Sequence, residues 1–339
     1  MAEQLHRFLY RLLRGESLDR REASDLLEAL ISPESTDAQI AAVLVALSRK
    51  GETVEELAGM ASALRSRAVR VHCAHDRFID TAGTGSSAAK TFNVSTAAAF
   101  VIAGAGLPVA KHGNRAASSR SGSADVLNAL GVNISALPEI SATCLTEIGM
   151  CFMFAPLYHG ATARVASVRK ELGIHTTFNL LGPLSNPAGA PMQLVGVWRR
   201  ELVELLARAL AALGTERAWA VHGEDGLDEI TLAGKTVVAE VRQGAVKSFT
   251  ISPEDFGLEQ RRIDHLGDGD AEVNAGIIRD VLNNDRRDEA RQLVLANAAA
   301  ALLVGGLAID LVQATQVAEK SIDSGAAKRK LDQLIEATN

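Results

Sequence analysis

The sequence predicts an α/β protein in which a small N-terminal α-helical domain precedes a larger domain with a mostly parallel central sheet flanked by helices. Residues 1–68 carry apolar side chains at helical spacing and show no strand pattern. From about residue 69, short β-branched or aromatic runs alternate with Ala-rich helical stretches, which is typical of a parallel sheet. With 339 residues, 47% of them hydrophobic, the chain can bury a large core. We expect domains at 1–70 and 71–339, the first joined by helices from about 160–190.

The N-terminal region divides into four expected helices. The first has apolar residues at helical spacing over 5–13 and ends at Gly15. Asp19 can cap the second, and Thr53 with Glu56 forms a capping box for the fourth. The second, third and fourth helices are expected at 21–31, 38–48 and 54–67.

The larger domain is expected to alternate strands and helices and then to turn β-rich. The Ala233-Gly234 and Gln243-Gly244 pairs predict hairpin turns. Ser95 or Thr96 can cap one helix, and Ser121 or Ser123 the next. Strands are expected at 78–79, 109–110, 151–154, 194–197, 219–221, 229–232, 236–241 and 246–251. Helices are expected at 95–103, 124–130, 137–148, 162–172, 200–213, 272–282, 286–304 and 308–334.

Composition excludes several classes of protein. The balance of 35 basic and 41 acidic residues gives a net charge of −6, which disfavours a general nucleic-acid binder. The three cysteines lack CxxC spacing, so the sequence indicates neither a zinc site nor a disulfide framework. The N-terminus has no signal-peptide pattern, and the apolar runs are too short to cross a bilayer. We therefore expect a cytoplasmic protein that binds neither nucleic acid nor membrane.

The first chemical stretch, 80–96, contains Gly83-Thr-Gly85 between a strand and a helix start. Glycines let the backbone approach a ligand, and a helix start offers free N–H groups to an anion. Ser95 and Thr96 add hydroxyl groups there. The alternative is an ordinary strand-to-helix loop, and the pattern is neither a P-loop nor a dinucleotide fingerprint.

The second stretch, 111–125, is rich in cations, hydroxyl groups and glycine. No Asp or Glu occurs anywhere in residues 81–124. Lys111 follows a strand, so we expect its ammonium group at the carboxyl edge of the sheet, where open α/β sheets bind ligands. A phosphate site is favoured over the alternative of a solvated basic loop.

The third stretch packs four carboxylates into six residues: Glu224, Asp225, Asp228 and Glu229. Like charges at this density cost free energy unless a cation is present. Oxygen ligands suit Mg²⁺, which commonly also binds substrate phosphates. The alternative is an exposed acidic turn.

The fourth stretch, 158–187, places Arg164 and Arg169 on one expected helix. Either guanidinium group could bind a carboxylate in a bidentate manner. The alternative is a pair of surface arginines on an amphipathic helix.

Taken together, these stretches resemble the anthranilate phosphoribosyltransferase family of tryptophan biosynthesis, essentially over the whole chain and in order. The KHGNR and DGLDE strings are the most specific in this context. The similar segments are Gln39–Ala42, Arg49–Thr53, Lys111–Arg115, Ser121–Leu127, Val168–Gly173, Thr177–Pro183, Asp225–Glu229 and Ala296–Ala300.

The resemblance implies transfer of the phosphoribosyl group of 5-phosphoribosyl 1-diphosphate (PRPP) to the amine of anthranilate, with release of pyrophosphate. It implies a homodimer formed through the helical domain and two Mg²⁺ ions per subunit, with Ser95, Asp228 and Glu229 as metal ligands. Gly83, Asn114 and Arg169 would bind anthranilate. No general acid or base is expected, because an arylamine is already neutral and nucleophilic. The PRPP residues carried over are Gly83, Ser86, Ser87, Thr91, Asn93, Val94, Ser95, Thr96, Lys111, His112, Gly113, Asn114, Arg115, Ala116, Ala117, Ser118, Ser119 and Ser123.

The chain departs from the family pattern at three places. Ser86-Ser87 stands where the family usually has Gly-Asp, Gly160 where it has Pro, and His175 where it has Arg. A related Mg²⁺-dependent transferase that uses another aromatic amine is therefore an alternative. Asn114-Arg115 argues against the pyrimidine nucleoside phosphorylases that share the fold. The intact Asp228-Glu229 pair and the net acidity argue against a non-catalytic nucleic-acid-binding paralogue.

Overall fold

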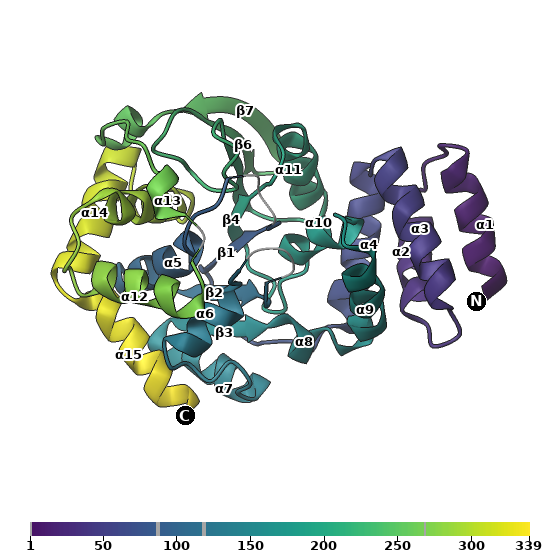
Figure 1. The fold of residues 1–339 in the computed structure, drawn as a ribbon, viewed down its shortest axis with the longest axis horizontal. Helices are drawn as coiled ribbons and strands as arrows, with labels where there is room; N and C mark the ends of the chain where they lie inside the picture. Colours follow the sequence, from purple (N-terminus) through teal and green to yellow (C-terminus); the bar gives the residue numbers. More distant parts are fainter. Residues whose placement is uncertain (1, 86–88, 117–119, 268) are drawn as a thin grey trace.

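A computed structural model describes residues 2–85, 89–116, 120–267 and 269–339, and it begins with a bundle of four helices (Figure 1). The predicted helices are confirmed, and so are the caps at Asp19 and Thr53. Both cap side chains accept a backbone N–H three residues later, and Thr36 does the same for the third helix. The helices are α1 (Ala2–Leu13), α2 (Arg20–Ile31), α3 (Asp37–Lys50) and α4 (Val54–Arg67).

A seven-stranded sheet in the order β3-β2-β1-β4-β5-β6-β7 forms the centre of the larger part (Figure 1). The first five strands in this order pair in parallel, and β6 and β7 add an antiparallel edge, so the predicted mostly parallel sheet is confirmed. The strands are β1 (Ile79–Gly83), β2 (Val109–Gly113), β3 (Met150–Phe154), β4 (Met192–Gly196), β5 (Arg217–Gly223), β6 (Thr236–Arg242) and β7 (Ala245–Ile251).

The predicted strand at 229–232 is wrong, and so is the hairpin turn at Ala233-Gly234. The chain forms turns between β5 and β6, because the backbone groups of Ile230 bind the side chain of Asn297 instead of a neighbouring strand. The Gln243-Gly244 hairpin is confirmed. Both of its residues have positive φ, 52° and 79°, as a two-residue turn of this kind requires.

Most of the remaining helices cover the two faces of the sheet, whereas α9 packs against α3 of the bundle (Figure 1). The predicted single helix at 308–334 is two helices, because the chain turns at Gly325, whose φ of +70° favours glycine. The α-helices that follow the bundle are α5 (Val94–Gly104), α6 (Ser123–Ala129), α7 (Pro138–Thr143), α8 (Ala155–Tyr158), α9 (Ala163–Leu172), α10 (Thr177–Leu184), α11 (Val203–Ala212), α12 (Ala271–Leu282), α13 (Glu289–Val304), α14 (Leu311–Asp323) and α15 (Ala326–Thr338).

The caps predicted for α5 and α6 are also wrong. Helix α5 begins one residue before Ser95, with Asn93 at its N-cap position, and α6 begins after Gly122. Gly122 at the N-cap position has no side chain to cap α6, and the Asp125 carboxylate in the first turn accepts the Gly122 N–H instead.

Alternate residues of the strands face two different cores. Leu194 and Trp219 belong to a core under α5 and α12–α15, whereas Val195 and Ala220 face a second core on the other side of the sheet. The second core continues through α10 and α11 into the helical bundle without interruption. We propose that residues 1–70 with α9 and α10 form the small domain and that the rest of 71–339 forms the large one.

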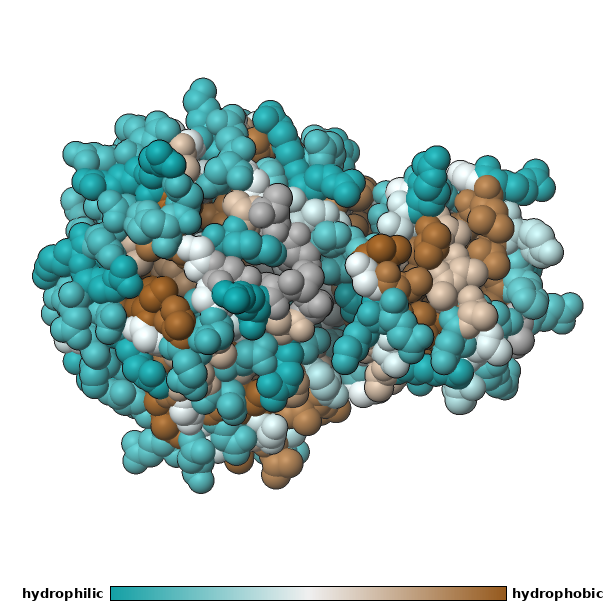
Figure 2. All heavy atoms as spheres, in the orientation of Figure 1, coloured by the Kyte–Doolittle hydropathy of each residue, from teal (hydrophilic) through white to brown (hydrophobic). Residues whose placement is uncertain are grey.

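Apolar side chains lie on the outside of the bundle as well as inside it. Tyr10 and Leu13 on α1 are 71% and 67% exposed, and Val45 on α3 is 43% exposed. Figure 2 shows apolar side chains gathered over these two helices on the viewed face. Among the described helices, none has both the length and the apolar composition needed to cross a membrane.

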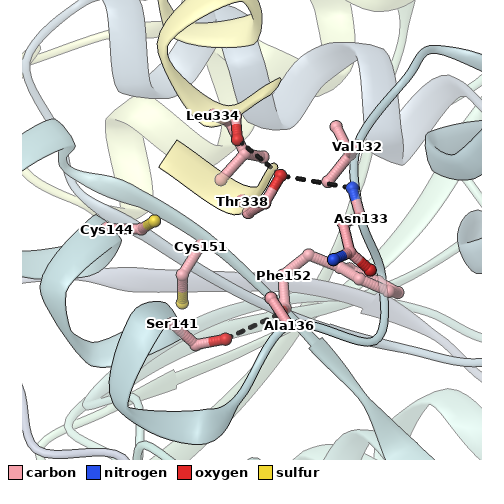
Figure 3. A pocket seen from close by; sticks show the side chains of 9 residues that line it. All are labelled: Val132, Asn133, Ala136, Ser141, Cys144, Cys151, Phe152, Leu334 and Thr338. Atoms are coloured by element: carbon pink, nitrogen blue, oxygen red, sulfur yellow. Dashed lines mark hydrogen bonds between the residues drawn. The ribbon is translucent and has the colours of Figure 1, made fainter. Parts of the chain in front are cut away.

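The C-terminal helix α15 packs against α5 and also contacts the edge strand β3 (Figure 3). Thr338 Oγ1 accepts the Asn133 N–H at 3.2 Å and donates to the Leu334 carbonyl at 2.8 Å. Cys144 and Cys151 line the small cavity beneath it, whose volume is about 10 Å³, and all three cysteines are free thiols. We therefore assign a structural role to the contacts at this end of the molecule.

Candidate active site

The carboxyl ends of β1 and β4 meet at the point where the chain reverses its direction of winding through the sheet. Gly83 at the end of β1 pairs with Gly196 at the end of β4. From there, β2 and β3 continue to one side and β5 to the other. Open α/β sheets bind their ligands at such a switch point. Both predicted phosphate loops start at this edge, one after β1 and one after β2.

Asp228 lies directly on this switch point. A Cβ atom on Gly196 would lie 1.7 Å from the Asp228 carbonyl oxygen, so only glycine allows the acidic turn to approach β4 this closely. A Cβ atom on Gly83 would lie 3.5 Å from Asp228 Oδ2. The Asp228 carboxylate is therefore held against the beginning of the first loop.

Glu229 caps helix α5, which follows the first loop. The Ser95 N–H donates to Glu229 Oε1 at 3.2 Å, and Asn93 makes no side-chain cap bond of its own. Desolvation raises the pKa of Glu229 to about 8, the Asp228 charge adds to this, and Lys111 opposes it. Two adjacent carboxylates in this environment favour the binding of a cation.

Lys111 is buried between the two loops, with its side chain directed at β1. Its Nζ donates to the Thr81 carbonyl oxygen at 2.5 Å and lies 3.5 Å from Ser95 Oγ. Burial lowers the pKa of Lys111, although Asp80 and Glu229 oppose the shift. The structure thus brings together the cation of the second loop, a hydroxyl group of the first and the acidic pair.

The donor set at the acidic pair fits Mg²⁺. Asp228 and Glu229 are half-buried and offer hard oxygen ligands next to the Ser95 hydroxyl group. No group of three or more His, Cys, Asp or Glu side chains could hold a metal ion within residues 2–85, 89–116, 120–267 and 269–339. The other ligands would be hydroxyl groups, water or substrate oxygen, which is how Mg²⁺ is commonly bound.

The other two acidic residues of the turn have different roles. Glu224 and Asp225 are exposed, and the Asp225 carboxylate accepts the Leu227 N–H at 3.2 Å and the Thr231 hydroxyl at 2.7 Å. Their spacing in the sequence did not distinguish them from Asp228 and Glu229.

The two described ends of the second loop are bonded to one another. Arg115 forms an ion pair with Asp125 at 2.7 Å, and its guanidinium group lies over the Phe154 ring. A Cβ atom on Gly122 would lie 2.4 Å from the Ala116 nitrogen, which shows how closely the two ends of the loop approach. The Arg115 charge thus helps to hold the loop in shape.

The residues predicted to bind PRPP differ in accessibility. Lys111 and His112 are buried, as are Val94 and Thr96 in the first turn of α5. Gly83, Asn114 and Arg115 are exposed, and the half-buried positions are Thr91, Asn93, Ser95, Gly113, Ala116 and Ser123. Ser86, Ser87, Ala117, Ser118 and Ser119 lie outside the described residues.

Of the two arginines in the fourth stretch, only Arg169 is available for a ligand carboxylate. Its Nε donates to Thr176 Oγ1 at 3.0 Å and its Nη2 to Asn179 Oδ1 at 3.1 Å, and no described carboxylate forms an ion pair with it. Arg164, in contrast, forms an ion pair with Asp37 of the bundle at 2.8 Å.

His112 and His159 form a buried pair between β2 and the segment after α8. Their ring centroids are 5.2 Å apart in an edge-to-face arrangement. Burial lowers the pKa of His112 to about 3 and that of His159 to about 4. Both rings are therefore neutral at pH 7 and would act on a ligand as hydrogen-bonding or packing groups.

This histidine pair predicts a loss of stability in acid. The folded pKa values lie below the ordinary value of 6.5, so the stabilisation is complete above pH 6.5 and is lost as the pH falls towards 3. Replacing both residues with Gln should reduce the fall in unfolding free energy between pH 7 and pH 4.5 by about 2 kcal/mol or more. Urea titrations at both pH values measure this. The exposed His72→Gln serves as control, and an unchanged pH dependence in the double variant would contradict the prediction.

Asn297 was not identified as a site residue from the sequence, although it belongs to the similar segment Ala296–Ala300. It is fully buried on α13, where its Oδ1 accepts the Ile230 N–H at 3.0 Å and its Nδ2 donates to the Ile230 carbonyl at 3.0 Å. It therefore fixes the backbone next to Asp228 and Glu229. The available signal was a single amide within the otherwise apolar run 293–304 of this helix.

Comparisons with known proteins agree with this site. Residues 75–328 match the glycosyl transferase family a/b domain, and residues 6–68 match its helical bundle domain. The chain is 54% identical over 328 residues to anthranilate phosphoribosyltransferase of Anaeromyxobacter dehalogenans, with 97% of each chain covered.

Solved structures give the same result. The Thermus thermophilus anthranilate phosphoribosyltransferase is 38% identical, with a TM-score of 0.91 over 98% of this chain and 99% of that one. The Saccharomyces cerevisiae enzyme, solved in complex with PRPP and Mg, is 28% identical, with a TM-score of 0.91 over 100% of this chain and 98% of that one. The yeast enzyme was also solved in complex with 4-fluoroanthranilate. The chain therefore belongs to the anthranilate phosphoribosyltransferase family.

Proposed function

We propose that the switch-point site transfers the phosphoribosyl group of PRPP to the amine of anthranilate, with release of pyrophosphate, in tryptophan biosynthesis. The observation that carries this proposal is the contact of Glu229 with Ser95 beside Lys111, where two phosphate loops and a pair of acidic residues meet. The yeast relative that binds PRPP and Mg supports the same assignment.

The two loops are proposed to hold PRPP, with Lys111 and the first turn of α5 facing its phosphate groups. Asp228, Glu229 and Ser95 would hold Mg²⁺, two ions per subunit, which neutralises negative charge on the leaving pyrophosphate when bound. The residues proposed for PRPP are those carried over above, from Gly83 to Ser123. Such fixed charges act where negative charge develops during the reaction.

Anthranilate is proposed to bind with its carboxylate on Arg169 and its amine towards the ribose, near Asn114 and Gly83. Thr176 and Asn179 fix the Arg169 guanidinium group, so it presents a preorganised donor pair. An arylamine is neutral and nucleophilic at pH 7, and displacement at an anomeric carbon passes through an oxocarbenium-like state. Orientation of the amine rather than a strong base is then the main requirement.

Arg169→Ala is expected to raise the KM for anthranilate by about 10- to 100-fold, because a charged hydrogen-bond pair is lost. The KM for PRPP should change little. Steady-state kinetics with each substrate varied in turn measure both values. Arg164→Ala, which removes the ion pair with Asp37, should leave both values unchanged. Equal increases for the two substrates in Arg169→Ala would remove this residue from the acceptor site.

The direct test of the function is pyrophosphate release from PRPP and Mg²⁺ with anthranilate, compared with a panel of aminobenzoates. Fastest turnover with anthranilate supports the proposal. Faster turnover with another amine would identify a transferase with a different acceptor. His175 and Gly160, which depart from the family pattern, are the reason for testing this alternative. Phosphorolysis of thymidine without transferase activity would instead identify a phosphorylase.

We also propose a homodimer formed through the helical bundle and a cytoplasmic location. Tyr10, Leu13 and Val45 leave apolar surface exposed on α1 and α3, and exposed apolar patches commonly mark protein interfaces (Figure 2). The three free thiols are consistent with a reducing compartment. Analytical ultracentrifugation of the protein tests the oligomeric state.

A further inference from the structure

Asn274 on α12 is a buried side chain that reaches the candidate site from far along the chain. Its side chain is 1% exposed, and its Nδ2 donates to Asn93 Oδ1 at 3.1 Å across 181 residues of sequence. Helix α12 packs against both α5 and α6, the two helices that follow the phosphate loops. Asn274 is therefore placed where both loops are anchored.

Asn93 is the residue at which the two loops are joined. Its Nδ2 donates to the Ser121 carbonyl at 3.3 Å, and its Oδ1 accepts the Ser121 hydroxyl at 3.3 Å. Although Asn93 occupies the N-cap position of α5, it makes no side-chain cap bond. Its amide is instead used to connect the first loop to the second.

The bond from Asn274 acts together with the two Ser121 bonds to orient this amide. The last side-chain torsion of asparagine has a broad energy profile, so hydrogen-bond partners decide which way its amide points. A donor directed at Oδ1 fixes that atom on the α12 side and leaves Nδ2 facing the Ser121 carbonyl. Without it, the amide could rotate, and the connection between the loops would weaken.

The Oδ1 atom of Asn274 indicates that this residue does not serve mainly to stabilise the fold. Its Oδ1 is buried and has no hydrogen-bond partner among the described residues, which costs free energy. A Cβ atom on Gly269 would lie 2.8 Å from this oxygen, so the preceding turn covers it closely. An apolar side chain would pack here without the cost of a buried, unpaired carbonyl.

We infer that Asn274 is a positioning residue that locks the two PRPP loops together through Asn93. The inference rests on the proposed function and concerns PRPP alone. Asn274 touches Asn93 and not the substrate, so its effect is on how well the loops are preorganised for the phosphate groups. Binding is stronger when the site is ordered beforehand.

Calorimetric titration of PRPP with Mg²⁺ into Asn274→Leu and Asn274→Ala tests this inference. Loss of one hydrogen bond should weaken PRPP binding about fivefold to tenfold. The KM for anthranilate at saturating PRPP should not change. Asn283→Ala, at the exposed C-terminal end of the same helix, is the matched control and should bind PRPP normally. A purely structural role would lower the melting temperature without changing PRPP affinity.

A double-mutant cycle gives the decisive measurement. If Asn274 acts through Asn93, adding Asn274→Leu to Asn93→Ala should weaken PRPP binding no further than Asn93→Ala does alone. Additive effects would overturn the inference, and so would unchanged PRPP affinity in both Asn274 variants. If Asn274→Leu does not fold, the smaller Asn274→Ala is used in the cycle. Failure of the unaltered protein to bind PRPP would overturn the proposed function itself and this inference with it.

Discussion

Replacing Asp228 with Asn and Glu229 with Gln together is expected to reduce Mg²⁺-dependent turnover by about a thousandfold, or about 4 kcal/mol of activation free energy. Both substitutions keep the size of the side chain and remove its negative charge. The charge of Glu229 lies beside Ser95, and that of Asp228 lies beside Gly83. The amides can still accept a hydrogen bond, so the fold should be retained. Initial rates at saturating PRPP, measured over a range of Mg²⁺ concentrations, give the effect.

The acidic turn contains its own control for this experiment. Glu224 is exposed and lies away from the switch point, so Glu224→Gln should turn over at the normal rate. Removing metal from the unaltered protein with a chelator should reproduce the loss seen in the double variant. Unchanged turnover in the double variant would refute the metal assignment.

Lys111→Met is expected to lower kcat/KM for PRPP by about a hundredfold, or about 2.7 kcal/mol. The ammonium group lies beside Ser95, where it would face developing negative charge, and methionine fills the same space without that charge. Circular dichroism confirms that the variant is folded at the assay temperature. Lys247→Met, on the exposed strand β7, is the control.

A loss confined to anthranilate kinetics would contradict the placement of Lys111 at the phosphate end of the site. The result also separates the two kinds of charge in the site. If the acidic pair acts through Mg²⁺ and Lys111 acts directly, the Lys111 variant should keep its dependence on Mg²⁺ and turn over more slowly at every concentration.

The features that the sequence predicted correctly are those whose cause is local. Short β-branched or aromatic runs located most strands and helical spacing most helices, because the strand residues are buried in two cores on the faces of the sheet. The cationic loop around Lys111 and the acidic turn were recognisable because their side chains are neighbours in sequence. The comparisons confirm the family that these segments resemble.

The features that were missed depend on partners far away in the chain. The turn at 229–232 has strand-like composition, but Asn297 supplies from α13 the hydrogen bonds that a strand would have found in the sheet. Similarly, α5 is capped by Glu229, which lies 134 residues from Ser95. The resemblance singled out Asp228 and Glu229 among the four acidic residues, but spacing alone gave no physical reason for this choice, which lies in the close approach of Asp228 to Gly196 in the folded chain.

The second hydrophobic core has a consequence for how the molecule can be divided. Because Val195 and Ala220 on the sheet share one continuous core with Leu44 of the bundle, removing the bundle would expose the interior of what remains. The N-terminal helices therefore stabilise the large domain, because they complete the core on one face of its sheet. A mutation that destabilises the bundle should therefore weaken substrate binding, even though no bundle residue has to touch PRPP.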